Sequence, residues 1–153
     1  MDKNPAQTQL RVILGNIYVR AGKDDQAIAE FQRAIDNGAK DQAGLYFRIG
    51  EAQRRKGDLE AAVASFDRAH VLAPASLPSL LQLALLLDGT GKPEQAIPLY
   101  EQILKLQPNH PVAMNNLAYL KAEDPASLDE ALHLAQSAAE KLPDNPDAAA
   151  TLG

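Results

Sequence analysis

The chain has 153 residues, enough for one ordinary domain with a sizeable core. Apolar residues make up 46% and aromatic residues only 5%, a balance that favours packed helices over a sheet. The net charge of −5 argues against a nucleic-acid-binding protein, which would need a basic face. The absence of cysteine excludes disulfides and thiol chemistry.

Apolar residues recur at steps of three and four, the spacing of one face of an amphipathic helix. The first predicted helix follows a lead-in at residues 1–7, ends near Ala21 and carries Leu10, Ile13, Leu14, Ile17 and Tyr18. Either Asp24 or Asp25 can cap the second helix, because a short carboxylate accepts from free backbone N–H groups. Asn37-Gly38 ends that helix, as a left-handed C-cap would.

The same spacing predicts three more helix pairs. We expect them at residues 42–56 with 59–72, 77–89 with 93–106, and 111–122 with 128–141. Ser127 and Glu130 have the spacing of a capping box at the start of the last of these helices. A ninth helix is expected from Pro146 to the last residue.

The pairs are copies of one unit of about 34 residues. A small residue stands at a fixed position in each copy: Gly15, Gly50, Ala84, Ala118 and Gly153. A second small position is filled by Ala27, Ala62, Ala96 and Ala131, and a third, mostly aromatic, by Phe31, Phe66, Tyr100 and Ala135. Two helices approach closely only where side chains at the crossing are small, so we interpret these positions as packing positions. The predicted repeats are residues 8–42, 43–76, 77–110 and 111–145, with a truncated fifth at 146–153.

Residues 43–76 carry the clearest signature: Tyr46, Ile49, Gly50, Gly57, Ala62, Phe66, Ala69 and Pro74. In this pattern the chain resembles the tetratricopeptide repeat family, as a single domain over residues 8–153. The tryptophan of the family pattern is missing, and Arg11, Tyr46, Leu80 and Met114 stand in its place. The style of the repeats is similar to bacterial multi-repeat proteins, and we expect a fragment of a longer chain. The resemblance implies an all-α solenoid of stacked antiparallel helix pairs, a right-handed superhelix, whose concave groove binds a peptide or helix of a partner protein.

The family geometry assigns the groove to the first helix of each repeat. The candidate partner-binding residues are Asn16, Arg20, Phe47, Arg48, Glu51, Arg54, Arg55, Gln82, Leu85, Asn115, Asn116 and Tyr119. Four arginines against one glutamate give the first two repeats a basic patch, floored by Phe47, which suits an acidic segment because guanidinium groups grip carboxylates. The alternative is that Arg54, Arg55 and Lys56 only complement the dipole at a helix carboxyl end.

The three asparagines of this set offer a donor and an acceptor to an extended peptide backbone. The alternative is that Asn115 and Asn116 have a repeat-packing role. The family's clamp for chaperone tails is mostly absent, since Val12, Pro78 and Gln82 stand where basic residues would be expected. We therefore expect a different partner.

Catalytic and metal sites find no support in the sequence. The histidines His70, His110 and His133 lack the spacing of metal ligands, and no glycine-rich phosphate loop follows a strand. We predict that the chain is not an enzyme and uses no cofactor or metal.

The sequence thus predicts a non-catalytic scaffold that binds a protein or peptide, and neither nucleic acid nor the membrane interior. The apolar run Leu77–Leu87 is too short to cross a bilayer, and the choice between cytoplasm and periplasm stays open. The alternative function is a self-associating structural spacer within a bacterial secretion or envelope assembly, joined through the terminal repeat at 146–153.

Overall fold

The computed structural model describes residues 4–141, which form eight α-helices and one short 3₁₀ turn without any strand. The predicted all-α class is confirmed. The chain divides into two compact units, Met1–Ser79 and Leu80–Gly153. The predicted helix at 146–153 lies outside the described residues.

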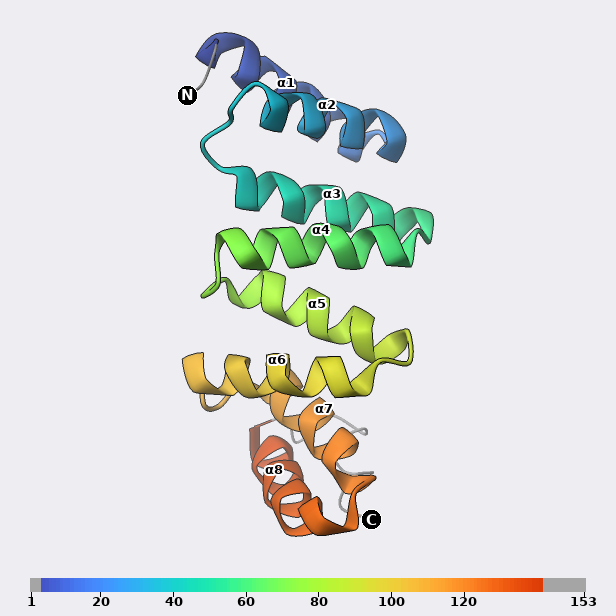
Figure 1. The fold of residues 1–153 in the computed structure, drawn as a ribbon, viewed down its shortest axis with the longest axis vertical. Coiled ribbons are helices and arrows are strands. Elements are labelled where there is room, and N and C mark those ends of the chain that lie inside the picture. Colours follow the sequence, from blue (N-terminus) through green and yellow to red (C-terminus); the bar gives the residue numbers. More distant parts are fainter. Residues whose placement is uncertain (1–3, 142–153) are drawn as a thin grey trace. The chain divides into compact units, whose positions relative to one another are not determined.

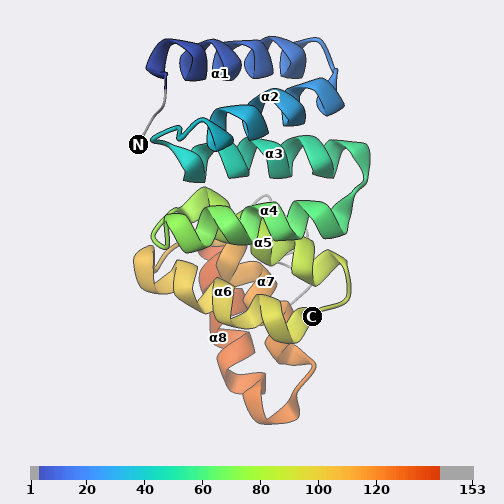
Figure 2. The same cartoon turned by 45° about the horizontal axis from the view of Figure 1, so that its top comes forward.

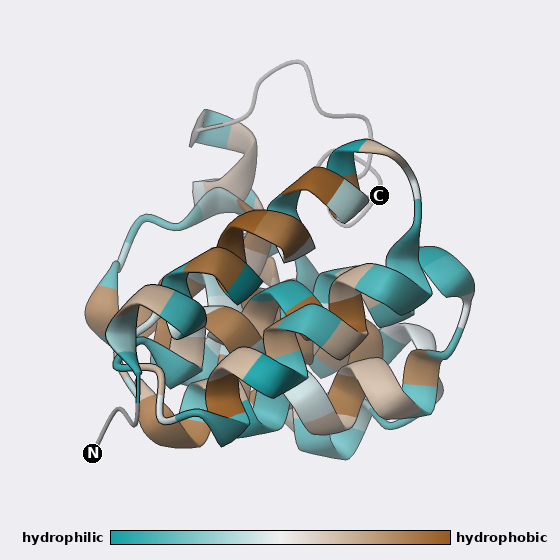
Figure 3. Cartoon of the chain, turned by 90° about the horizontal axis from the view of Figure 1, so that it is seen from above, coloured by the Kyte–Doolittle hydropathy of each residue, from teal (hydrophilic) through white to brown (hydrophobic). Residues whose placement is uncertain are grey.

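The first unit contains two helix pairs in which each helix packs against the next. Helix α1 (Pro5–Arg20) packs against α2 (Asp24–Asp36), α2 against α3 (Gln42–Lys56), and α3 against α4 (Leu59–Leu72), as Figures 1 and 2 show. Hydrophobic and hydrophilic residues alternate along the helices (Figure 3), because each helix turns one side toward its neighbours and another toward water.

The core of this unit forms where the small repeat position of one helix meets the aromatic position of the next. Phe31 and Phe66 are fully buried. A Cβ atom added to Gly50 would lie 2.9 Å from Cε1 of Phe66, and one added to Gly15 would overlap the ring of Phe31. Glycine at these two positions lets the helix backbone rest directly on the ring, as the packing interpretation requires.

The second unit contains most of α5 (Leu77–Gly89), followed by α6 (Pro93–Leu106), α7 (Pro111–Ala122) and α8 (Leu128–Lys141). The α5–α6 turn is made at Gly91, whose φ of +75° favours a residue without a side chain. Helix α7 packs against both α6 and α8. Met114 and Ala138 are buried between α7 and α8, with Leu134 partly buried beside them.

The helix bounds agree closely with the sequence-based prediction, with differences at capped ends. Helix α1 already includes residues 5–7, because the Asn4 side chain accepts from the backbone N–H of Gln7 and Pro5 suits the first turn. The predicted cap by Asp24 or Asp25 is wrong: both lie inside α2, and no side chain caps its first turn.

The predicted capping box of α8 is also wrong. The chain enters α8 through a 3₁₀ turn, Pro125–Ser127, in which Asp124 accepts from the backbone N–H of Ala126 at 3.1 Å. The Ser127 hydroxyl donates to Asp124 at 3.0 Å. Glu130 does not reach back to Ser127, since its carboxylate accepts from Lys121 of α7 at 3.0 Å.

Candidate functional site

The first unit carries two hollows along α1 and α3. The larger, of about 480 Å³, is lined by apolar side chains such as Val12, Ile13 and Leu45 and by polar ones such as Lys40 and Asp41. The smaller, of about 260 Å³, is lined by Asn16, Val19, Arg48, Glu51 and Arg55. Asn16 and Arg48 line both hollows, so these two residues lie at the centre of the candidate surface.

Arg48 is exposed but held in place from two sides. Its guanidinium donates to the Asn16 side-chain oxygen at 2.5 Å and lies 5.9 Å from the centre of the Phe31 ring. Both contacts orient the group without neutralising it, because an amide and an aromatic ring carry no net charge. Within residues 4–141, Arg48 forms no ion pair. Its charge is therefore available to a carboxylate from outside.

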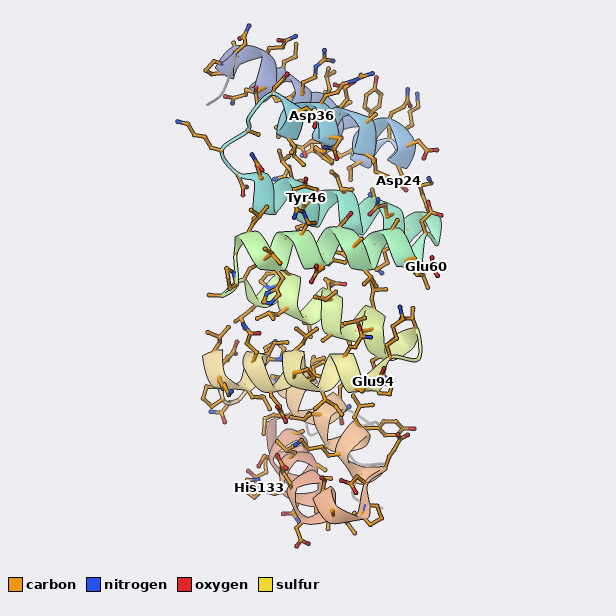
Figure 4. The ribbon with its side chains drawn as sticks, viewed as in Figure 1. Asp24, Asp36, Tyr46, Glu60, Glu94 and His133 are labelled. Carbon is orange, nitrogen blue, oxygen red and sulfur yellow. The ribbon has the colours of Figure 1, made fainter. Side chains whose placement is uncertain are left out.

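The cations at the carboxyl end of α3 differ from Arg48, because each has an acidic partner. Arg55 donates twice to one oxygen of Asp24, at 3.1 and 2.6 Å, and Figure 4 shows Asp24 at the same end of the unit as the α3 carboxyl end. Arg54 lies 3.4 Å from Glu51 on the same helix. The basic surface therefore carries less net charge than a count of its arginines suggests.

Lys56 continues this pattern one residue further along. Its amine lies 2.5 Å from Asp25 and 3.1 Å from Asp58, and these hydrogen bonds raise the pKa of Lys56. The Asp24 and Asp25 contacts join α3 to the start of α2, so they also tie the two helix pairs together. Arg20 is exposed, and its side chain forms no ion pair within residues 4–141.

Phe47 packs into the protein, away from both hollows. Its ring meets Phe66 of α4 edge to face, with centroids 5.3 Å apart and planes at 63°. The ring beside Arg48 is Phe31, which the sequence analysis assigned to packing alone. The spacing of 17 residues between Phe31 and Arg48 carries no helical or strand signal, so only the packing of α1, α2 and α3 reveals this neighbour.

In the second unit, the side chains of the two predicted asparagines differ in their hydrogen bonding. The Asn116 amide donates to the backbone oxygen of Val112, one turn earlier in α7, at 3.0 Å. The side-chain oxygen of Asn115 is buried and has no hydrogen-bond partner in the described part of the chain. Tyr119 is 62% exposed, while Gln82 and Leu85 are half-buried.

The second unit also holds an acidic pair that the sequence analysis did not assign to the site. Burial, and then the neighbouring charge of Glu123, raise the pKa of the Asp88 carboxyl. Asp88 forms no ion pair among residues 4–141. Thus the first unit carries a cation without an acidic partner among residues 4–141, Arg48, and the second unit carries two neighbouring carboxylates, Asp88 and Glu123.

Neither metal ligation nor membrane insertion has a structural counterpart in the described residues. They contain no group of three histidine or acidic side chains placed to hold a metal ion. No helix among them combines the length and hydropathy needed to cross a bilayer. His110 has a structural task, since its Nδ1 accepts from the backbone N–H of Ala113 at the start of α7, at 3.2 Å.

Comparison with solved structures identifies the same fold in several proteins. The chain is similar to MamA from Desulfovibrio magneticus RS-1, with a TM-score of 0.83 and 19% identity over 98% of this chain and 83% of that one. It is similar to a tetratricopeptide repeat protein from Parabacteroides merdae, with a TM-score of 0.86 and 20% identity over 95% of this chain and 57% of that one. It is also similar to YrrB, described as a TPR protein with an unusual peptide-binding site, with a TM-score of 0.73 and 21% identity over 89% and 69% of the two chains.

Sequence comparison agrees with this result. The chain is 31% identical to human Superkiller complex protein 3 over 103 residues, which are 67% of this chain and 6% of that protein. The chain thus spans a small fraction of the relatives it matches. Two family models described as tetratricopeptide repeat match residues 3–76 and 77–120. Together they cover more than half of the sequence, and the chain belongs to the tetratricopeptide repeat family.

Proposed function

We propose that this chain is a non-catalytic interaction scaffold whose first unit binds an extended acidic segment of a partner protein along α1 and α3. The observation that carries the proposal is Arg48, a positioned cation without an acidic partner in residues 4–141, between two hollows. Family membership and the likeness to YrrB, a TPR protein with a peptide-binding site, support a role in peptide binding.

The chemistry of the larger hollow supports a segment that mixes carboxylates with aliphatic side chains. Val12, Ile13 and Leu45 offer apolar contact, while Arg48 and Lys40 outnumber the one acidic side chain, Asp41. Asp41 is already engaged, since it accepts from the backbone N–H of Gly44 at 2.9 Å. A carboxylate of the bound segment beside Arg48 would accept a charge-assisted hydrogen bond. The aliphatic side chains of the same segment would be buried against the apolar lining, which also stabilises the complex.

Binding can be tested with a labelled probe peptide of about eight alternating glutamate and leucine residues, a length suited to a groove of this kind. A second peptide with glutamine in place of glutamate measures how much of the binding free energy comes from the negative charge. We expect fluorescence anisotropy to show tighter binding of the glutamate peptide. Arg48→Ala should weaken that binding by roughly 1.5–3 kcal/mol, or about 10- to 150-fold in Kd.

Arg54→Ala is the matched control, because Arg54 lies on the same helix, pairs with Glu51 and lines neither hollow. We expect it to change Kd by less than about fivefold, as for an exposed ion pair. Equal binding of the two peptides, or equal effects of the two substitutions, would contradict the proposed acidic partner.

A further inference from the structure

The two hollows of the first unit follow one another along α1 and α3. The two helices run in the same direction, as Figures 1 and 2 show. The larger hollow is lined by residues of both helices up to Asn16 and Arg48, and the smaller hollow by residues from this pair onward. A segment lying along both helices would therefore meet the larger hollow, Arg48 and the smaller hollow in that order or in the reverse.

The larger hollow offers aliphatic contact close to the free cation. Ile13 is 47% exposed, and it lines this hollow together with Val12 and Leu45. Arg48, at the end of the hollow, forms no ion pair within residues 4–141. The surface can therefore bind an aliphatic side chain and a carboxylate of one segment close to each other.

The smaller hollow supplies no second free cation among the described residues. Arg55 donates to Asp24 at 2.6 Å, and Glu51, which lines the same hollow, lies 3.4 Å from Arg54. A second carboxylate placed here would be repelled by Glu51 and would compete with Asp24 for Arg55. The surface therefore suits a segment with one acidic residue at this point rather than a run of acidic residues.

The distance between the aliphatic lining and the cation limits how far apart the two side chains can be in the segment. Leu45 precedes Arg48, and Ile13 precedes Asn16, by three residues, which is about 4.5 Å along a helix. In an extended segment, adjacent residues are about 3.3 Å apart and point to opposite sides, whereas residues two positions apart point to the same side, about 7 Å apart. Two positions is therefore the shortest spacing that brings both side chains onto the protein.

The size of the hollows favours an extended segment over a helical one. One turn of an α-helix, about 10 Å wide and 5.4 Å long, occupies roughly 420 Å³. The larger hollow measures about 480 Å³ and the smaller about 260 Å³. A helical turn exceeds the smaller hollow, whereas an extended segment inserts only every second side chain.

We propose that the first unit recognises a short extended motif in which one aliphatic and one acidic residue stand two positions apart and point to the same side. The aliphatic side chain occupies the larger hollow beside Ile13, and the carboxylate accepts from Arg48. This motif rests on the proposed function and specifies the segment that the partner presents. The alternating probe described above points its leucines and its glutamates to opposite sides, so it measures the effect of charge alone.

The spacing can be tested with labelled peptides of about eight residues that carry one leucine and one glutamate in a serine and glycine background. The two residues are placed one, two or four positions apart, in both orders, and Kd for the complete chain is measured by fluorescence anisotropy. We expect the two-position peptide, in its better order, to bind about fivefold more tightly than either other spacing, because only this spacing buries the leucine while the carboxylate stays at Arg48. Tightest binding at four positions would indicate a helical segment and would overturn the motif, as would equal binding at all spacings or tightest binding at one.

Substitutions in the protein assign the two halves of the motif. Ile13→Ala should abolish the advantage of the two-position peptide over a peptide with serine in place of leucine, and it should leave the preference for glutamate over glutamine unchanged. Arg48→Ala should have the opposite effects. Ile17→Ala is the matched control, because Ile17 lies on the same helix, is 54% exposed and lines neither hollow.

Equal effects of Ile13→Ala and Ile17→Ala on the leucine preference would overturn the assignment of the larger hollow. A preference for glutamate without any effect of spacing would contradict the motif and leave the acidic partner in place, whereas loss of the glutamate preference in wild type would contradict the proposed function itself. Circular dichroism should show equal helix content in all variants, since both isoleucines are replaced at exposed positions.

Discussion

The pairs α1–α2 and α7–α8 occupy equivalent repeat positions and fill their cores differently. In α1–α2, Gly15 lies directly against the ring of Phe31. In α7–α8 the corresponding residues are Ala118 and Ala135, both fully buried, and larger neighbours such as Met114 and Leu134 supply the bulk. The repeat therefore constrains the space shared by two helices more strongly than the identity of any one residue.

The two units also differ in how they handle buried charge. In the first, the carboxylate of Glu30, whose side chain is 8% exposed, binds Arg11 at 3.0 Å and Arg33 at 2.5 Å. In the second, Asp88 lies near Glu123 and has no cation among residues 4–141. The first arrangement stabilises the fold, while in the second burial and the charge of Glu123 disfavour the ionised form of Asp88.

The largest expected effect comes from removing the charge of Glu30. Burial raises its pKa, but the hydrogen bonds and charges of Arg11 and Arg33 outweigh burial and hold the pKa below 4.5. Glu30→Gln should lower the free energy of unfolding at pH 7 by about 1–3 kcal/mol, measured by urea denaturation. Since the ionised form is favoured in the folded state, the loss should shrink as the pH falls below 4.5 and through the folded-state pKa.

Glu51→Gln is the control for this change, because the pair with Arg54 is exposed and 3.4 Å long. It should cost less than about 1 kcal/mol. A similar loss for both substitutions would remove the distinction between buried and exposed pairs in this unit.

A smaller effect is expected where glycine contacts the aromatic ring. Gly15→Ala places a methyl group against Phe31, a clash that exceeds the roughly 1 kcal/mol by which alanine improves a helix. We expect a net loss of about 1–2 kcal/mol in thermal or urea unfolding. Gly89→Ala, where an added Cβ meets nothing within 4 Å, should instead be neutral or stabilising. Stabilisation by Gly15→Ala would show that the ring has room to move, as in the alanine-based pair.

The smallest expected effect is a rise in the free energy of unfolding after a substitution in the second unit. The folded-state pKa of Asp88 is raised above 3.8, so its ionisation costs stability above that pH. Asp88→Asn should therefore stabilise the protein at pH 7 by about 0.2–0.5 kcal/mol, the size of a like-charge contact, and the gain should vanish toward pH 3.8.

Glu123→Gln tests the origin of that gain. If repulsion between the two carboxylates causes it, either substitution removes the same interaction, and the double substitution should gain less than the sum of the two. Additive gains would assign the whole effect to burial of Asp88.

Most of the fold was predictable from local sequence. Apolar spacing predicted seven helices after the first to within a residue or two, since a helix forms from hydrogen bonds and side chains close in sequence. Gly38, with φ of +86°, confirmed the predicted left-handed end of the second helix. The capping of α8 could not be predicted, because Lys121 of α7 competes for Glu130.

The candidate site was predictable only as a set of positions. The family geometry assigned both Arg48 and Asn16 to one surface, and the structure adds the hydrogen bond between them. The sequence by itself determined the helices and the repeat, because these depend on spacing along the chain, whereas the residues assigned to the binding surface stay a prediction. Only the tertiary structure decided that Asp24 neutralises Arg55 and that Phe31 lies beside Arg48, since charge and stacking depend on distances between residues of different helices.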